Sequence, residues 1–433
     1  MNAPPPAIAP PTTRLGQLQR GHGAGHLAAT AAGAAAHEDL LQCLLVDPRH
    51  DRRVENRARY YGELIVLLDL PLAPLLGPLQ DAPVGVLAHD ALAAAFVLGH
   101  PATRDLLADE NTAEPIVAGI TSCLWGERWA RAVDLPVRAR ALWLQFDLQH
   151  ADSAQSQRRP AEPTPLGALS VEQVLELARG PESVRRDRLL GELCARGDEA
   201  TRAQLAKVAS EDFVLGRVRL ACRALGLLAD DRLLPLAEDL FGRDDVFVDP
   251  ERRLPADLRM RRDCLADYAR HLPGPMALPI ARDWHLRGGY FTQVAGSLFE
   301  LHATAADRAR LEAFVAAHAF GPAPAIGEEL DALSRLGDPA SVPLLVAVTE
   351  ASSSSQARHR AVRGLARFPA HPLAREVLQH ALWDSEDEAS DAACQSRFRL
   401  DPLAAVRLDQ LARSPLVDPE LAAHAARRQR DAG

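Results

Sequence analysis

Arginine shows the clearest pattern for chemistry in this sequence. Several segments that precede a tight turn carry arginines near their start, namely Arg57, Arg59, Arg217, Arg219, Arg261, Arg262, Arg358 and Arg360. Guanidinium groups along one face of an elongated protein could hold an acidic peptide or a phosphate backbone. Alternatively, they form a structural ladder with acidic residues of neighbouring turns, such as Asp212, Asp230, Asp231 and Asp338. The sequence favours the ladder, because its formal net charge of -9 leaves few arginines unpaired.

Two aromatic segments could also bind a ligand. Residues 124–146 hold three of the five tryptophans among arginines, a combination that could stack nucleobases. Trp125 and Trp129 are four residues apart, however, which is typical of the buried face of a helix. Residues 282–291 bring Trp284, His285 and Tyr290 around a Gly-Gly hinge, and a loop there could hold these side chains out of the core. We would therefore look for a pocket first in the second segment.

One acidic run, "DSEDEASD" at residues 384–391, stands out from the mixed charges around it. The simplest interpretation is a solvated loop between helices. The alternative is a surface that caps a basic partner.

The composition excludes several classes of protein. The acidic net charge argues against a general affinity for nucleic acid, although a local basic patch stays open. The six cysteines form no C-x-x-C pair, so we expect neither a zinc knuckle nor a disulfide framework, and a reducing cytoplasm fits best. Residues 1–26 are rich in Pro and Gly and lack a secretory pattern, which predicts a disordered tail. No apolar run is long enough to cross a membrane.

A recurring unit predicts the architecture that must position these residues. An apolar anchor stands before a Gly, Asp or Pro turn, and in the best copies a proline follows seven residues after the anchor. The anchors are Leu67, Leu98, Leu228, Leu272, Leu336 and Phe368. Most of their spacings fit a period near 32 residues, with one longer step that an insertion at 244–257 explains. Such a period indicates an array of helix pairs.

The junction chemistry supports two helices per unit. In "LGDPAS", Gly337 can end one helix in the left-handed conformation, Asp338 can cap the next, and Pro339 suits its first position. Gly197 and Asp198 repeat this arrangement. In the unit at 216–241, we expect Val218, Ala221, Leu225 and Leu228 to be buried before the turn and Leu234, Leu236 and Leu240 after it. Small residues such as Gly226 should let neighbouring helices approach.

The stretch "VRLACRALGLLADDRLLPL" resembles the short bacterial HEAT-like repeats, over perhaps residues 57–110 and 180–410. The resemblance implies a helical solenoid and says little about function. HEAT-fold deoxyhypusine hydroxylases bind a di-iron centre through several His-Glu pairs, but only His37 and Glu38 form such a pair here. HEAT-fold DNA glycosylases use a basic cleft, which the net charge opposes.

We therefore predict an all-α solenoid of roughly eight to ten helix pairs. The predicted parts are a tail (1–26), an N-terminal sub-array (27–148), a linker or insertion (149–170) and a C-terminal array (171–428). The predicted function is a non-catalytic bacterial cytoplasmic scaffold that binds a protein partner through its concave surface, without metal or cofactor. The alternative is a HEAT-fold enzyme or ligand-handling protein, either glycosylase-like or binding a small molecule. The candidate binding residues are Arg57, Arg59, Arg219, Arg261, Arg262, Trp284, His285, Tyr290, Arg358 and Arg360.

Overall fold

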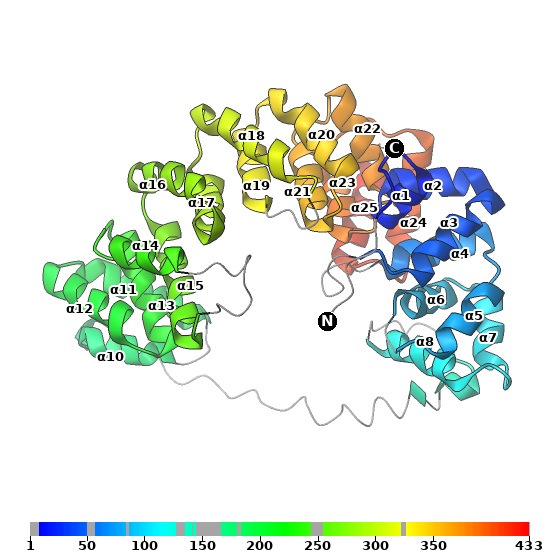
Figure 1. Cartoon of the computed structure of the whole chain (residues 1–433), viewed down its shortest axis with the longest axis horizontal. Helices are drawn as coiled ribbons and strands as arrows, with labels where there is room; N and C mark the ends of the chain where they lie inside the picture. Colours follow the sequence, from blue (N-terminus) through cyan, green and yellow to red (C-terminus); the bar gives the residue numbers. More distant parts are fainter. Residues whose placement is uncertain are drawn as a thin grey trace. The chain divides into compact units, whose positions relative to one another are not determined.

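The computed structural model describes residues 8–49, 57–83, 86–126, 135–140, 142–143, 166–179, 183–243, 254–321 and 326–432. Every regular element in these ranges is a helix, and none of these residues forms a strand (Figure 1). The all-α class is therefore confirmed for the part of the chain that the structure describes.

The chain divides into two compact units. Unit 1 combines residues 1–157 with residues 312–433, and unit 2 consists of residues 158–311. Unit 1 thus joins the two ends of the sequence, which the predicted division into 27–148 and 171–428 does not anticipate. The predicted linker lies outside the described residues as far as 165, and its last part holds a short 3-10 helix, η4 (Leu166–Ala168).

The N-terminal part of unit 1 consists of short helices joined by tight turns. They are α1 (Arg14–Gln19), α2 (Gly23–Ala32), η1 (Gly33–Ala36), α3 (His37–Leu45), α4 (Ala58–Leu68), α5 (Ala73–Gln80), α6 (Leu87–Val97), α7 (Pro101–Ala108) and α8 (Glu114–Gly126). Alternate helices pack against each other: α2, α4, α6 and α8 form one layer, and α1, α3 and α5 form a second. Their buried residues make up a continuous hydrophobic core.

The C-terminal part of unit 1 follows the same plan. After α18 (Arg308–His318), which spans the boundary between the units, come α19 (Gly327–Leu336), η8 (Pro339–Ser341), α20 (Val342–Ala351), α21 (Ser355–Leu365), α22 (Pro372–Ala381), α23 (Asp387–Gln395), α24 (Pro402–Arg413) and α25 (Pro419–Ala432). Helices α19, α21, α23 and α25 pack in sequence as one layer, and α20 packs against α22 in the other.

Unit 2 again places alternate helices side by side. Its elements after η4 are α10 (Val171–Glu176), η5 (Leu177–Arg179), α11 (Ser183–Arg196), α12 (Glu199–Glu211), α13 (Leu215–Leu227), α14 (Leu234–Gly242), α15 (Ala256–His271), α16 (Gly274–Arg287), α17 (Gly289–His302) and η7 (Ala305–Asp307). Helices α11, α13, α15 and α17 form one layer. The predicted insertion at 244–257 lies outside the described residues up to 253.

The predicted turn chemistry is confirmed at both junctions. Gly337 has a φ of 66° at the end of α19, and the Asp338 side chain accepts a hydrogen bond from the Ala340 amide 2.9 Å away. Gly197 has a φ of 30°, and the Asp198 carboxylate caps α12 by accepting from the Thr201 amide at 2.7 Å. A positive φ is easiest for glycine, so these residues fix where one helix stops and the next begins.

The predicted core stripe is correct before the turn of the 216–241 unit. Val218, Ala221 and Leu225 on α13 are buried, whereas Leu228 is only partly buried. The close approach predicted at Gly226 is also present. A Cβ atom there would lie 2.5 Å from the carbonyl oxygen of Tyr268 on α15, so any larger residue would push the two helices apart.

The predicted stripe after the turn is correct at Leu240 and wrong at Leu234 and Leu236. Leu233, Ala237 and Leu240 are buried, whereas Leu234 and Leu236 are partly exposed. Helix α14 begins at Leu234, and residues spaced four and then three apart share a helix face. The buried face therefore includes the residue just before the helix rather than its first residue.

The prediction of a disordered tail over residues 1–26 is wrong from residue 8 onward. Helix α1 and the start of α2 lie within it, and Leu18 is fully buried. The carbonyl of Gly21 accepts a hydrogen bond from the Ser385 amide at 2.9 Å. At Gly23, a Cβ atom would lie only 1.8 Å from the carbonyl oxygen of His380. The glycines that suggested disorder instead permit close packing against the C-terminal helices.

Candidate functional site

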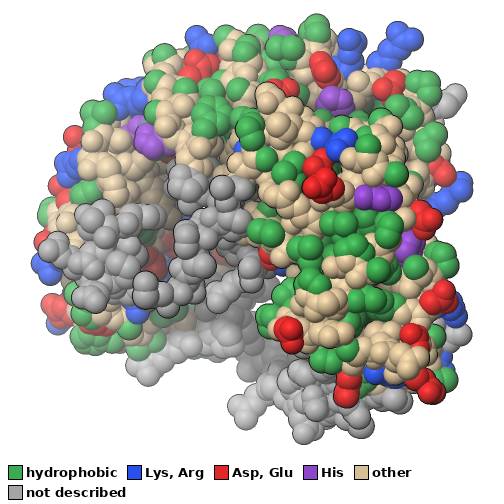
Figure 2. All heavy atoms as spheres, turned by 45° about the vertical axis from the view of Figure 1, so that its right-hand side comes forward, with side chains coloured by type: hydrophobic (Ala, Val, Ile, Leu, Met, Phe, Trp, Pro, Cys, Tyr) green, Lys and Arg blue, Asp and Glu red, His purple; other side chains and the backbone are tan. Residues whose placement is uncertain are grey.

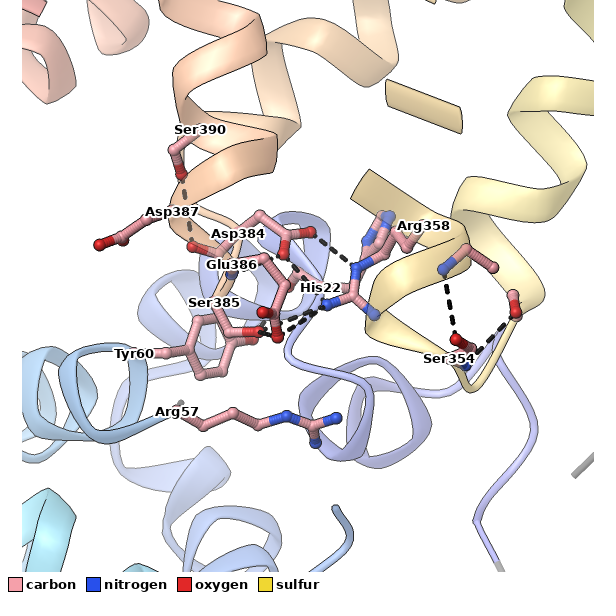
Figure 3. Close-up of polar contacts among 12 residues, drawn as sticks. His22, Arg57, Tyr60, Ser354, Arg358, Asp384, Ser385, Glu386, Asp387 and Ser390 are labelled. Atoms are coloured by element: carbon pink, nitrogen blue, oxygen red, sulfur yellow. Dashed lines mark hydrogen bonds and ion pairs between the residues drawn. The ribbon is translucent and has the colours of Figure 1, made fainter. Parts of the chain in front are cut away.

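The arginines predicted at the starts of two helices meet in unit 1 (Figure 3). Arg57 and Arg59 lie at the start of α4, and Arg358 lies in α21. Arg57 is fully buried and donates through Nη1 to the carbonyl of Gln19. Arg59 donates through Nη2 to the Asp384 carbonyl at 3.1 Å and to the Asp387 carboxylate at 2.8 Å. Arg59 therefore connects α4 to residues more than 300 positions away in the sequence.

Arg358 forms the most deeply buried ion pair of this region. Its Nε lies 3.0 Å from Asp384 Oδ2 and its Nη2 lies 3.1 Å from Oδ1, so the contact is bidentate. The two side chains are 0% and 1% exposed, and Glu386 adds a second carboxylate 3.8 Å from Nη2. Burial by itself would lower the pKa of Arg358, but Asp384 and Glu386 outweigh it and raise that pKa.

Glu63 is the centre of a second buried group. Its Oε2 lies 2.9 Å from Arg407 Nη2 and 3.5 Å from His26 Nε2, and its Oε1 lies 3.6 Å from Arg59 Nη1. Burial would raise the pKa of Glu63, but Arg407, His26 and Arg59 together lower it well below its ordinary value. Burial lowers the pKa of His26 despite the nearby carboxylate. At neutral pH, Glu63 is therefore ionised, and burial favours the neutral form of His26.

His22 caps α2 from within the same region. Its Nδ1 accepts from the Ala24 amide, and its carbonyl accepts from the Tyr60 hydroxyl at 2.9 Å. Burial lowers the pKa of His22 to about 4, although Asp384 acts in the opposite direction.

We call these buried groups the ionic joint; its members are His22, His26, Arg57, Arg59, Glu63, Arg358, Asp384, Glu386 and Arg407. The ionic joint holds the N-terminal helices against the C-terminal helices of unit 1.

An open groove lies along three successive helices of one layer, next to the ionic joint. It is formed by α21, α23 and α25 and has a volume of about 650 Å³. Five of its lining residues are acidic and one is an arginine: Asp387, Glu388, Asp391, Asp418, Glu420 and Arg363. Asp387 also binds Arg59 of the ionic joint, so one carboxylate belongs to both features. We call this feature the acidic groove.

The acidic run at 384–391 is buried at its start and helical in its remainder. The solvated-loop interpretation is wrong at the start of the run, because Asp384, Ser385 and Glu386 are 1%, 3% and 6% exposed. Helix α23 then begins at Asp387 and turns its remaining carboxylates toward the acidic groove. Outside that groove the charges are more mixed, and Figure 2 shows acidic and basic side chains interspersed over the face that it presents.

The other predicted arginines also meet acidic or aromatic partners. Arg360 lies 2.8 Å from Asp331 in unit 1. In unit 2, Arg217 contacts three carboxylates, and Arg219 lies 3.9 Å from Asp267. Arg261 Nη2 donates to the Asp212 carbonyl at 2.9 Å, and Arg262 lies 4.0 Å from the centre of the Tyr290 ring. This pattern agrees with the ladder interpretation in kind, although many partners differ from those expected.

The aromatic cluster around the Gly-Gly hinge is part of a core and not of a loop. Helix α16 continues to Arg287, so Trp284 and His285 lie in its last turn. Trp284 is 1% exposed, packs edge-on against Phe241 and donates to Glu238 at 3.2 Å. His285 is buried against Phe299. The expectation that a loop holds these side chains out of the core is therefore wrong. Gly288 and Gly289 both have positive φ and lie where α16 ends and α17 begins.

Tyr290 and the remaining candidates give no catalytic arrangement. The Tyr290 hydroxyl donates to Asp263 at 3.0 Å. His37 contacts the Leu68 carbonyl oxygen through Nε2, at 2.9 Å. No group of three or more His, Cys, Asp or Glu residues suited to a metal occurs in the described ranges. The tryptophan segment was a second candidate, but the side chain of Trp125 and all of Trp129 lie outside the described residues.

Four of the nine members of the ionic joint could not be found from the sequence pattern. It selected the arginines at 57, 59 and 358 by their shared offset from an anchor, but it did not select His22, His26, Glu63 or Arg407. The acidic run at 384–391 contains the carboxylate partners of Arg59 and Arg358. Two features of the sequence could indicate these partners: the position of Asp384 at the start of that run, and the spacing of four residues between Arg59 and Glu63.

No protein-family model matches this chain, and no curated protein matches it. The fold and the site define it as an all-helical protein with two units, one of which is closed by a buried ionic joint beside an acidic groove. No helix of the described residues has the length and apolar character needed to span a bilayer.

Proposed function

We propose that this chain is a non-catalytic helical-repeat scaffold, similar to HEAT-like arrays, that binds a protein partner along one helix layer. The observation that carries the proposal is the acidic groove, which runs over α21, α23 and α25 without interruption. A concave surface built from successive helices suits an extended partner, because each repeat adds a few contacts in line with the last.

The placement of the titratable groups supports binding over catalysis. Active sites concentrate groups with shifted pKa values in a cleft that substrate can reach. Here His22, Glu63 and Arg358 have shifted pKa values but lie buried among packed side chains of the ionic joint, and among the residues that line the acidic groove only His359 has a shifted pKa, which burial lowers. Their partners explain their shifts as parts of a structural network.

The cysteines support a reducing compartment, and we propose the cytoplasm. All six are free, and burial raises the pKa of the Cys43 and Cys394 thiols to about 12. Thiols held in this state are poor nucleophiles and persist where no disulfide is needed.

Affinity purification of the tagged full chain from its own cells, with nuclease treatment and mass spectrometry, tests the proposal. We expect a protein partner that is recovered reproducibly after nuclease treatment. Recovery of nucleic acid or a small ligand without a protein would overturn the scaffold assignment and favour the enzyme or ligand-handling alternative.

A further inference from the structure

We infer that the acidic groove binds an arginine-bearing segment of a protein partner, and this inference rests on the proposed scaffold function. It concerns the chemistry of the bound segment, which the scaffold function leaves open. The groove presents carboxylates from α23 and from the start of α25 toward the same open volume. A cationic side chain in that volume would reach more than one of them.

Two of the five carboxylates that line the groove have basic partners: Asp387 pairs with Arg59, and Asp391 Oδ1 lies 2.6 Å from His424 Nδ1. Glu388, Asp418 and Glu420 have no basic residue within ion-pair distance among the described residues. The one arginine of the lining, Arg363, is engaged by Asp331. These three carboxylates without ion-pair partners repel one another, and a cationic segment would relieve that repulsion.

The structure also contains a guanidinium already bound at the edge of this groove. Arg59 comes from α4, far away in the sequence, and its Nη2 contacts both Asp387 Oδ1 and the carbonyl of Asp384. The groove-lining carboxylate Asp387 is 40% exposed, so part of it stays accessible from the groove. A single nitrogen makes both contacts, so this rim already holds one cationic donor group against a carboxylate and a backbone carbonyl together.

The dimensions of the groove suit a short extended segment. Neighbouring packed helices lie about 8–10 Å apart, so three in a row span roughly 20 Å between the outer axes. An extended chain covers this distance with about six residues at roughly 3.3 Å each. Alternate side chains of such a segment would face the groove and meet the carboxylates of α23 and α25 in turn.

A labelled hexa-arginine peptide, with hexa-lysine and hexa-glutamate peptides as comparisons, tests this inference on the full chain by fluorescence anisotropy. We expect hexa-arginine to bind, hexa-lysine to bind more weakly because it lacks the planar fork, and hexa-glutamate not to bind. Raising the salt concentration should weaken the binding of both cationic peptides.

A triple variant removes the unpaired charges of the groove: Glu388→Gln, Asp418→Asn and Glu420→Gln. The amides keep side-chain shape, and Asn at 418 can still accept from the Glu420 amide as Asp418 does at 2.8 Å. At about 0.5 kcal/mol for each exposed pair, the loss of three charges should weaken hexa-arginine binding roughly tenfold.

A matched control removes three exposed carboxylates of unit 1 that lie outside the groove: Asp105→Asn, Glu110→Gln and Glu114→Gln. We expect this control triple to change binding less than about twofold. Equal weakening by both triples would mean that the peptide follows the overall negative charge of the chain, and the inference would be overturned. Absence of hexa-arginine binding would overturn it as well.

A further variant is expected to tighten binding, a result that loss of folding cannot produce. Arg363→Gln removes the only arginine of the lining, whose side chain is 57% exposed, and should tighten hexa-arginine binding about twofold to threefold. Unchanged or weaker binding would contradict the inference.

The purified partner separates this inference from the proposed function. If the groove triple loses the partner and the control triple keeps it, both proposals hold. If both triples keep the partner, the groove inference fails and the scaffold stands. If no protein is recovered with the unmodified chain, the scaffold assignment itself fails.

Discussion

The ion pair between Arg358 and Asp384 gives the sharpest test of how the ionic joint stabilises unit 1. Replacing Arg358 with Met keeps an elongated side chain but leaves Asp384 buried without its bidentate partner. Because both side chains are at most 1% exposed, we expect the free energy of opening this region to fall by about 3–5 kcal/mol. Asp384→Asn should also destabilise it, since Arg358 then keeps only the more distant Glu386 carboxylate.

The double variant Arg358→Met with Asp384→Asn should lose less stability than the two single losses added together. Once one charge has been removed, removing the other no longer breaks the pair, so the cycle isolates their coupling, which we expect to exceed about 2 kcal/mol. Hydrogen exchange read by mass spectrometry on peptides of α21 and α23 reports this opening locally, which suits a chain with two units.

Arg413→Met serves as the control for these variants. Arg413 pairs with Asp409 at 2.8 Å, but its side chain is 79% exposed, so the loss should stay within about 0.5 kcal/mol. The reasoning would be refuted if Arg358→Met cost no more than the control. Strict additivity of the two single variants would refute it as well.

Three further outcomes can be measured on the same protein. Gly226→Ala should destabilise unit 2 by about 1–3 kcal/mol because its Cβ would meet a backbone carbonyl, whereas Gly191→Ala in α11 of the same unit meets no atom within 4 Å and should be neutral or slightly stabilising; urea unfolding compares them. As the pH falls from 6.5 toward 4, the unfolded chain protonates His22 before the folded chain does, so unit 1 should lose up to roughly 3 kcal/mol, and His22→Asn should flatten that dependence. A pH profile that this variant leaves unchanged would exclude His22 as the cause. Of the six free cysteines, the half-buried Cys194 should react first with a thiol reagent, and reaction of a fully buried one before it would contradict the packing described.

Local chemistry made much of the fold predictable. Two helix junctions could be predicted from local sequence alone, at Gly337 with Asp338 and at Gly197 with Asp198. A left-handed glycine and a capping carboxylate act only on residues a few positions away. The stripe on α13 was equally readable from helical spacing. The stripe predicted on α14 is wrong at Leu234 and Leu236 because these residues are two positions apart and cannot share a helix face, and the buried face passes through the small Ala237 instead.

The ionic joint could be predicted only in part, because its partners are distant in the sequence. The spacing rule selected Arg57, Arg59 and Arg358 together, yet nothing in the sequence shows that Glu63 meets Arg407. For the same reason the composition of residues 1–26 was misleading. Glycine there signals flexibility when it is solvated and close packing when a carbonyl such as that of His380 lies above it.

The ionic joint also sets the order in which the chain can fold as it is made. Arg59 must wait for Asp387, which lies 328 positions later in the sequence. A ribosome adding roughly 5–20 residues each second needs tens of seconds to cover that distance. During this time, the arginines and glycines of the N-terminal helices that pack against the C-terminal helices in the folded protein remain exposed to solvent. Closure of unit 1 is therefore a late event of synthesis, and slow translation of the middle of the chain should lengthen the period in which these helices are open to chaperones or to misassembly.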